Sequence, residues 1–209
     1  MKTVAVYTDY SSVSEYTGEI LKSLIAAHIE ESSEKLRNDS VCVRALLRFV
    51  LKKHFGVTAF VISADENGKP YLKGSNLHIN FSHSDGKALC VVSTEPVGCD
   101  VQSFKPFNPK VSERYYREEE SGALLKSKSR DYDFIKLWVL KESILKQRGT
   151  GLSGGLNSYG FSKYLGADCF DAYGLKFRCF DDESFCYAIC SETDDITVYE
   201  INIEETIKI

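Results

Sequence analysis

A chain of 209 residues with 43% hydrophobic and 27% charged side chains has the composition of a folded protein, with one large domain or two small ones. Its formal charge of −4 and its pI near 5.7 lack the basic surface that nucleic-acid binding needs, so we expect no nucleic-acid partner. No apolar run approaches the roughly 20 residues that cross a bilayer, and the first residues lack a signal-peptide core. We therefore expect a cytoplasmic protein without a membrane partner.

The first half of the chain mixes strand and helix patterns. Alternating apolar residues favour strands, whereas apolar residues three and four apart favour helices. The Asn67-Gly68 pair favours a turn, and Gly56 is a typical helix stop. We expect helices over 20–29 and 41–54, a turn over 65–70, and strands over 4–7, 57–63, 78–81, 88–93 and 97–101.

The second half begins after the proline-rich stretch 105–110, which predicts a boundary between an N-terminal subdomain, 1–104, and a C-terminal subdomain, 105–209. Each half has helices followed by strands, and residues 88–92 resemble residues 186–190. This favours an α+β fold of two similar subdomains. We expect helices over 112–126 and 132–147, and strands over 175–180, 185–190 and 196–201.

The seven cysteines form an odd set without a Cys-x-x-Cys pair, which argues against a disulfide framework and against a structural zinc site. We expect small buried thiols that pack in the core.

Three polar clusters could carry chemistry. The first, Phe81-Ser82-His83-Ser84-Asp85-Gly86, places hydroxyls and an imidazole at a strand end, where they could donate hydrogen bonds to phosphate; a structural histidine in a polar turn is the alternative. In the second, Asp100 and Gln102 are two residues apart on a strand and point to the same side. Their oxygens suit a hard cation such as Mg²⁺, although both could simply face solvent.

The third cluster places Trp138, Glu142 and Lys146 at four-residue spacing along one face of a helix. A carboxylate and an ammonium in this row could supply a base and a phosphate-binding cation. Alternatively, Glu142 and Lys146 form an ordinary exposed helix pair and Trp138 belongs to the core.

In order and spacing, these clusters together resemble the 4′-phosphopantetheinyl transferase superfamily, of the surfactin-synthetase-activating type. The family signature reads roughly Phe-x-x-Ser-His-Ser, Gly-x-Asp-x-Glu and Trp-x-x-Lys-Glu-x-x-x-Lys. The resemblance extends to the Gly68-Lys69-Pro70 turn and to residues 149–153, and so covers nearly the whole chain. It implies two α+β subdomains related by a pseudo-two-fold axis.

The activity that the resemblance implies is transfer of 4′-phosphopantetheine from coenzyme A to a serine of an apo acyl or peptidyl carrier protein, with Mg²⁺ as cofactor. It assigns Asp100 and Glu142, with Gln102 assisting, to the metal, and Glu142 also to catalysis as the base, directly or through a water. Lys146 is assigned to catalysis and to the phosphates. The other coenzyme A contacts are Arg44, Lys69, Ser82 and His83, while basic residues within 33–37 resemble further nucleotide contacts.

Gln102 departs from the family pattern, in which glutamate is commoner at this position. An amide oxygen can still bind Mg²⁺, but the site has one negative charge less, so we expect weaker metal binding.

The carrier surface is expected in the segment from Ser103 to Arg117, whose aromatic and basic residues suit an acidic carrier helix; a solvated linker is the alternative. We expect a monomer, because a duplicated chain could build the whole site at its internal interface. Two other functions remain open at this stage. A non-catalytic coenzyme A-binding or nucleotide-binding module would not need Glu142, and a metal-dependent phosphohydrolase would use water in place of the serine.

Overall fold

The computed structural model describes residues 1–209 except 27, 29–37 and 152–154. Within this part of the chain, the strands form two four-stranded sheets and a small two-stranded hairpin. The strands are β1 (Thr3–Asp9), β2 (Ile62–Ala64), β3 (Pro70–Leu72), β4 (His78–Ser84), β5 (Lys87–Ser93), β6 (Val97–Ser103), β7 (Cys169–Ala172), β8 (Leu175–Asp181), β9 (Phe185–Ser191) and β10 (Ile196–Glu200). The α-helices are α1 (Glu15–Ala26), α2 (Asn38–Phe55), α3 (Pro109–Tyr115), α4 (Glu118–Lys126) and α5 (Arg130–Arg148), and short 3₁₀ turns lie at Leu156–Ser158, Ser162–Tyr164 and Ile203–Thr206.

The first sheet has the strand order β10-β1-β5-β4, and the second has the order β6-β9-β8-β7. Within these orders, β1-β5-β4 and β6-β9-β8 repeat one pattern, and each set of three strands is called a unit below. In each unit, the strand that comes first in the chain pairs with the strand that comes last. Each unit carries one long helix, α2 or α5, between its first strand and its later hairpin. The chain therefore has the expected α+β fold, and the similar segments 88–92 and 186–190 lie in the corresponding strands β5 and β9.

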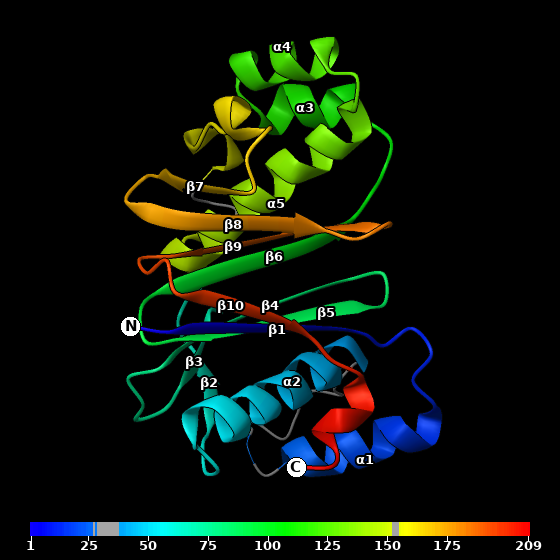
Figure 1. Cartoon of the computed structure of the whole chain (residues 1–209), viewed down its shortest axis with the longest axis vertical. Helices are drawn as coiled ribbons and strands as arrows, with labels where there is room; N and C mark the ends of the chain where they lie inside the picture. Colours follow the sequence, from blue (N-terminus) through cyan, green and yellow to red (C-terminus); the bar gives the residue numbers. More distant parts are fainter. Residues whose placement is uncertain (27, 29–37, 152–154) are drawn as a thin grey trace.

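The two sheets pack face to face between the two long helices (Figure 1). Side chains alternate along the strands. In β1, Val4 and Val6 join the core beneath α2, whereas Ala5 faces the second sheet. In β9, Ala188 joins the core beneath α5, whereas Tyr187 faces the first sheet. The layers are thus helix, sheet, sheet and helix, with three apolar cores.

The sheets exchange strands across the expected boundary at residues 104 and 105. β6 precedes the boundary but pairs with β9, whereas β10 follows it and runs parallel to β1, where Thr3 pairs with Ile196 (Figure 1). The division into two subdomains stays a prediction. The strand order favours a start of the second unit before β6.

Several local expectations were wrong. Of the expected strand 57–63, only residues 62 and 63 pair, in β2, because its short partner β3 contributes three residues. The expected helix over 112–126 is two helices, since Tyr116 and Arg117 have extended backbones between α3 and α4. Strand β7, which is only four residues long, was missed.

All seven cysteines are free thiols; six are buried, whereas Cys169 is exposed on the edge strand β7. None of the described helices is long and apolar enough to cross a membrane.

Candidate active site

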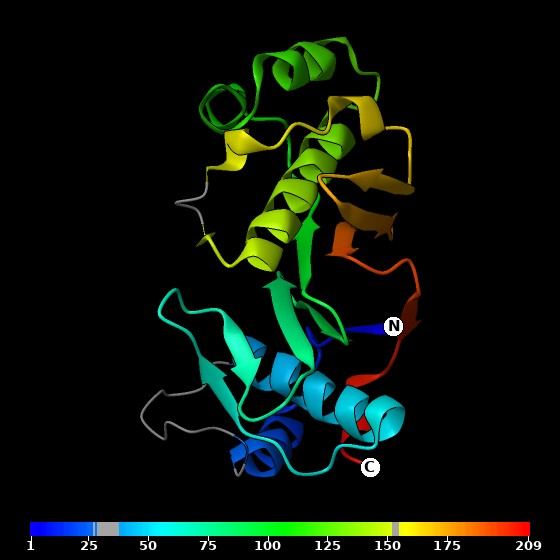
Figure 2. The same cartoon turned by 90° about the vertical axis from the view of Figure 1, so that its left-hand side faces the viewer.

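The three motifs meet where β4, at the edge of the first sheet, approaches β6, at the edge of the second, under helix α5 (Figure 2). The hydroxyl of Ser82 donates to Asp100 Oδ1 at 2.7 Å. Lys146 Nζ donates to the same Asp100 oxygen at 2.7 Å and to Ser82 Oγ at 3.0 Å. One residue from each of the three clusters thus enters a single hydrogen-bonded group.

Gly98 lets helix α5 come this close to β6. A Cβ atom on Gly98 would lie 2.0 Å from the carbonyl oxygen of Ser143 and 2.5 Å from the backbone nitrogen of Gln147. Any side chain here would push α5 away from β6. The glycine therefore sets the distance between the helix that carries Glu142 and Lys146 and the strand that carries Asp100.

Glu142 lies one helical turn before Lys146 on α5 and is half-buried. Burial raises the pKa of this carboxyl, the nearby charge of Asp100 raises it further, and Lys146 partly offsets both. Two carboxylates in close proximity repel each other when both are ionised. The pair is therefore electrostatically suited to receive a cation.

Lys146 stays protonated in this environment. Burial opposes its charge, but Asp100 and Glu142 outweigh that effect and raise the pKa of the ammonium group. With 29% of its side chain exposed, the group can also reach a ligand that enters from solvent.

Gln102 points to the same side of β6 as Asp100, because the two are two residues apart on one strand. Its Nε2 donates to Ser84 Oγ at 3.1 Å and to Ser103 Oγ at 3.4 Å. The expected third metal residue therefore lies beside the first, with its nitrogen held by two hydroxyl groups.

Lys69 extends the cationic surface from the hairpin β2–β3. Its Nζ donates to the carbonyl oxygen of Gln147 at 2.6 Å, and burial lowers its pKa although Asp65 opposes this. Lys69 and Lys146 line one cavity of about 200 Å³ together with Phe81. Two cations on one hollow suit a phosphate-bearing ligand.

His83 and Arg44 lie apart from this group. His83 follows Ser82 on β4 and faces the other side of the strand, where its Nδ1 lies 3.6 Å from Asp39 Oδ2 and both line a cavity of about 400 Å³. Arg44 donates to the carbonyl oxygen of Ser40, one turn earlier on α2, at 3.1 Å. The basic residues expected within 33–37 lie outside the described residues.

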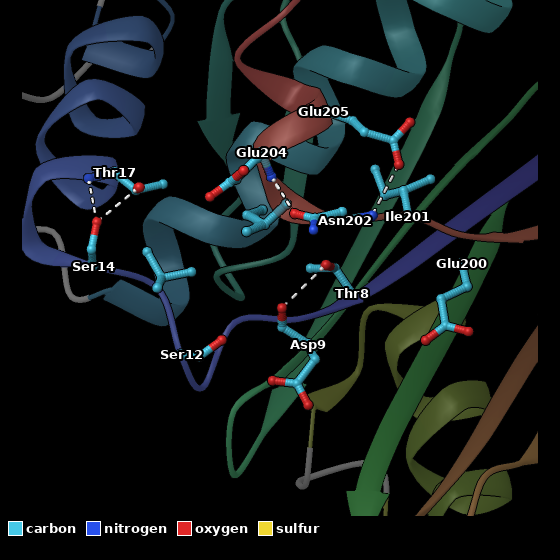
Figure 3. Close-up of a pocket in the computed structure, with 12 residues that line it drawn as sticks. Thr8, Asp9, Ser12, Ser14, Thr17, Glu200, Ile201, Asn202, Glu204 and Glu205 are labelled. Atoms are coloured by element: carbon cyan, nitrogen blue, oxygen red, sulfur yellow. Dashed lines mark hydrogen bonds between the residues drawn. The ribbon is translucent and has the colours of Figure 1, made fainter.

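A further cavity of about 550 Å³ lies between β1, α1 and the C-terminal segment (Figure 3). Carboxylates and hydroxyls line it, including Asp9, Glu200, Glu204 and Glu205. Several of these groups bond locally; for example, Glu205 Oε1 accepts from the Asn202 backbone nitrogen at 3.0 Å. The cavity contains none of the predicted site residues, and its acidic lining would repel a phosphate.

The donor set fits Mg²⁺ rather than a softer metal. Among the described residues, no group of three or more histidine, cysteine, aspartate or glutamate side chains could hold a metal ion. Asp100, Glu142 and the amide of Gln102 offer two carboxylates and a neutral oxygen. Mg²⁺ needs no more, because it usually binds one or two carboxylates and completes its shell with water and substrate phosphate.

Lys141, the first lysine of the third motif, was given no role from the sequence. It is fully buried and bonds to Glu120 Oε2 at 2.6 Å, which ties α5 to α4. The sequence signals were the motif itself and a lysine at an otherwise apolar helix position.

Trp138 was expected either in the row with Glu142 and Lys146 or in the core. It packs against Tyr115, with ring centroids 5.9 Å apart, as a partly buried member of the core beneath α5.

Comparison with known proteins supports the same interpretation. A family model described as the 4′-phosphopantetheinyl transferase superfamily matches residues 96–195. The 4′-phosphopantetheinyl transferase Sfp of Bacillus subtilis (strain 168) is 31% identical over 205 residues, which cover 93% of this chain and 88% of the relative. The 4′-phosphopantetheinyl transferase ffp of Bacillus subtilis is 32% identical over 170 residues, 76% of this chain and 75% of the relative. The Bacillus pumilus enzyme psf-1, with the same activity in its name, is 29% identical over 68% of this chain and 65% of its own length.

Proposed function

The chain belongs to the 4′-phosphopantetheinyl transferase superfamily, and from this premise we propose that Asp100, Glu142 and Lys146 carry out the transfer of phosphopantetheine from coenzyme A to a carrier-protein serine. The observation that carries the proposal is the contact of Lys146 Nζ with Asp100 Oδ1 at 2.7 Å, beside the raised pKa of Glu142. In the reaction, the serine oxygen forms a bond to the phosphorus that bears pantetheine. The bond from that phosphorus to the nucleotide breaks, and 3′,5′-adenosine bisphosphate leaves.

Glu142 is the proposed base. Glu142 is half-buried on α5 one helical turn before Lys146, so its carboxylate lies beside the cation that would hold the phosphates. Glu142 takes the serine proton as the new oxygen–phosphorus bond forms, while Asp100 remains an acceptor for Ser82 and Lys146.

Lys146 supplies positive charge to the reacting phosphates. Its raised pKa keeps it an ammonium group, and Asp100 and Ser82 fix its position before the substrate arrives. Preorganised charge of this kind stabilises the transition state because nothing has to reorient during the reaction. Lys69, across the same cavity, is the proposed second phosphate contact.

Asp100 and Glu142, with Gln102, would hold Mg²⁺. When bound, this ion supplies neutralisation of the pyrophosphate charge. The mutual repulsion of the two carboxylates supports this assignment, since a cation relieves it. The hydrogen bonds of Gln102 Nε2 to Ser84 and Ser103 leave the amide oxygen as the end that can bind a cation.

The adenosine end of coenzyme A is proposed to extend toward His83 and Arg44, as the resemblance implies. The cavity at His83 lies on the far side of β4 from Ser82, so the ligand would pass over the strand end. The proposal for Arg44 rests on the resemblance alone.

The carrier protein is proposed to dock on the segment from Ser103 to Arg117. Arg117 is engaged by the carbonyl oxygens of Asn157 and Ser158 at 3.0 and 3.1 Å, which leaves Lys110 and Arg114 as the exposed cations on α3. All proposed catalytic residues come from one chain, which supports action as a monomer. Charge reversal at Lys110 and Arg114 should raise the KM for the carrier and leave the KM for coenzyme A unchanged.

The test is to incubate the protein with coenzyme A, Mg²⁺ and an apo carrier protein and to weigh the carrier by intact mass spectrometry. A gain of one phosphopantetheine supports the proposal. Glu142→Gln and Asp100→Asn should abolish the gain, whereas the exposed control Glu183→Gln should retain it. Free nucleotide without carrier modification would indicate hydrolysis, and coenzyme A binding without either product would indicate a binding module.

A further inference from the structure

A row of polar side chains on β4 joins the two sheets beside the active site. Alternate residues Asn80, Ser82 and Ser84 point to the same side of the strand. Asn80 Oδ1 accepts from the backbone nitrogen of Cys99 at 3.0 Å, Ser82 donates to Asp100 at 2.7 Å, and Ser84 accepts from Gln102 at 3.1 Å. Because β4 and β6 belong to different sheets, these side chains take the place of a backbone ladder between them.

Ser84 accepts two hydrogen bonds at once. In addition to Gln102 Nε2 at 3.1 Å, the backbone nitrogen of Ser103 donates to Ser84 Oγ at 3.4 Å. Ser103 Oγ, the second acceptor of the Gln102 amide, in turn donates to Asp85 Oδ2. The amide nitrogen of Gln102 is therefore linked through Ser103 to a carboxylate.

Asp85 is fixed as the charged end of this chain of hydrogen bonds. Ser103 Oγ donates to its Oδ2 at 2.5 Å and Lys105 Nζ lies 3.6 Å away; these two contacts hold its pKa below the ordinary value. The residue occupies the β4–β5 turn with φ of 42°, followed by Gly86 at 93°. Aspartate tolerates this left-handed region better than most residues, so the turn holds the carboxylate beside the end of β6.

We infer that Ser84 and Asp85 are positioning residues that fix the Gln102 amide with its nitrogen toward Ser84 and its oxygen free to bind Mg²⁺. An amide has one donor end and one acceptor end, so a nitrogen held by Ser84 and Ser103 determines where the oxygen points. The inference rests on the proposed function, because it concerns the same metal site.

The arrangement is built for an amide rather than for a carboxylate. A glutamate at position 102 would place an acceptor beside Ser103, whose hydroxyl already donates to Asp85. Ser103 could then donate to only one of two carboxylates, which would repel each other. Gln102 avoids this conflict, and the site has one negative charge less in return.

Removal of Ser84 should weaken metal binding through Gln102 alone. Partners that orient a metal ligand typically contribute about 10- to 100-fold to metal affinity. We expect Ser84→Ala to weaken binding about tenfold, at the lower limit, because Gln102 keeps its weaker contact with Ser103. Asp85→Asn keeps the turn and removes the charge, so a smaller loss is expected.

The experiment measures the affinity of the full chain for Mn²⁺, as a probe for Mg²⁺, by electron paramagnetic resonance without coenzyme A. Ser84→Ala, Gln102→Ala and the double variant form a cycle, with the exposed residue Ser184→Ala as control. The inference requires Ser84→Ala to lose about tenfold, the double variant to bind no more weakly than Gln102→Ala, and the control to match the wild type. In the transfer assay, the Mg²⁺ concentration for half-maximal rate should rise by the same factor for Ser84→Ala, and excess Mg²⁺ should restore the rate.

Three results would overturn the inference. The Mn²⁺ affinity of Ser84→Ala could equal that of the wild type, or Ser84→Ala could weaken Mn²⁺ binding as much in a chain that already carries Gln102→Ala as it does in the wild type. The third is a wild-type protein that binds no Mn²⁺. Thermal unfolding of the wild type and of Ser84→Ala at the same midpoint shows that the variant is folded. If Ser84→Ala unfolds at a lower temperature, the Mn²⁺ affinities of Asp85→Asn, Gln102→Ala and their double variant are compared instead. A wild-type protein that shows the full Mn²⁺ cycle but does not modify a carrier would refute the proposed function and leave the positioning inference intact.

Discussion

The buried ion pair between Lys141 and Glu120 should be among the most sensitive positions for stability. Both side chains are fully buried, and Lys141 Nζ contacts Glu120 Oε2 at 2.6 Å and the carbonyl oxygens of Leu156 and Tyr159 at 2.9 and 2.5 Å. Substitution of Lys141 by methionine keeps most of the volume but leaves a buried carboxylate without its cation and two carbonyls without their donor.

The expected loss is large because a lone buried charge costs more than the pair contributes. Removal of one partner of a buried pair typically costs about 3–5 kcal/mol. Glu120 keeps bonds from the backbone nitrogens of Phe161 and Arg117, at 2.7 and 2.9 Å, which should hold the loss for Lys141→Met near the lower limit. Against a total stability of about 5–15 kcal/mol for a typical protein, such a loss is a large fraction.

A double-mutant cycle by urea unfolding measures this coupling. We expect Lys141→Met and Glu120→Met each to lower the free energy of unfolding strongly, and the double variant to lose clearly less than the sum of the two. Glu19→Gln is the control, because Glu19 pairs with Lys22 while 66% and 39% of their side chains are exposed, and such pairs contribute about 0–1 kcal/mol. Additive losses would refute the reasoning, as would a Lys141→Met loss no greater than that of the control.

Glu142→Gln should inactivate the enzyme yet stabilise it near neutral pH. The folded-state pKa of Glu142 is raised above its ordinary value of 4.5, so the wild type loses stability as the pH rises through that pKa. Thermal unfolding without metal should show the variant above the wild type at pH 7 and level with it below about pH 4; the reverse order would contradict the assigned shift. Gly98→Ala should cost several kcal/mol, because its Cβ would meet the Ser143 oxygen at 2.0 Å, whereas Gly122→Ala on α4, with nothing within 4 Å, should gain about 0.5–1 kcal/mol by urea unfolding. A loss at Gly98 no larger than the change at Gly122 would show that the close approach is not rigid. Mg²⁺ at about 100 times its Kd should stabilise the wild type by about 2.7 kcal/mol and leave Asp100→Asn unchanged; an equal shift in both would place the ion elsewhere.

The sequence predicted most of the site because its residues lie within regular elements of known periodicity. The four-residue spacing of Glu142 and Lys146 fixes them on one face of a helix, and the two-residue spacing of Asp100 and Gln102 fixes them on one side of a strand. The resemblance to a known family joined these local patterns, and the comparisons confirmed that family. The individual roles of the residues stay predictions.

The sequence by itself determined the family, most of the helices and strands, and which side chains share a face. Only the tertiary structure decided what those faces meet, because β4 and β6 come from different sheets and no local periodicity relates them. The approach of α5 over Gly98, the exchange of β6 and β10 between the units, and the link from Gln102 through Ser103 to Asp85 all depend on that packing. Gln102 therefore looked like a weakened carboxylate in the sequence, whereas the structure surrounds it with partners that suit an amide.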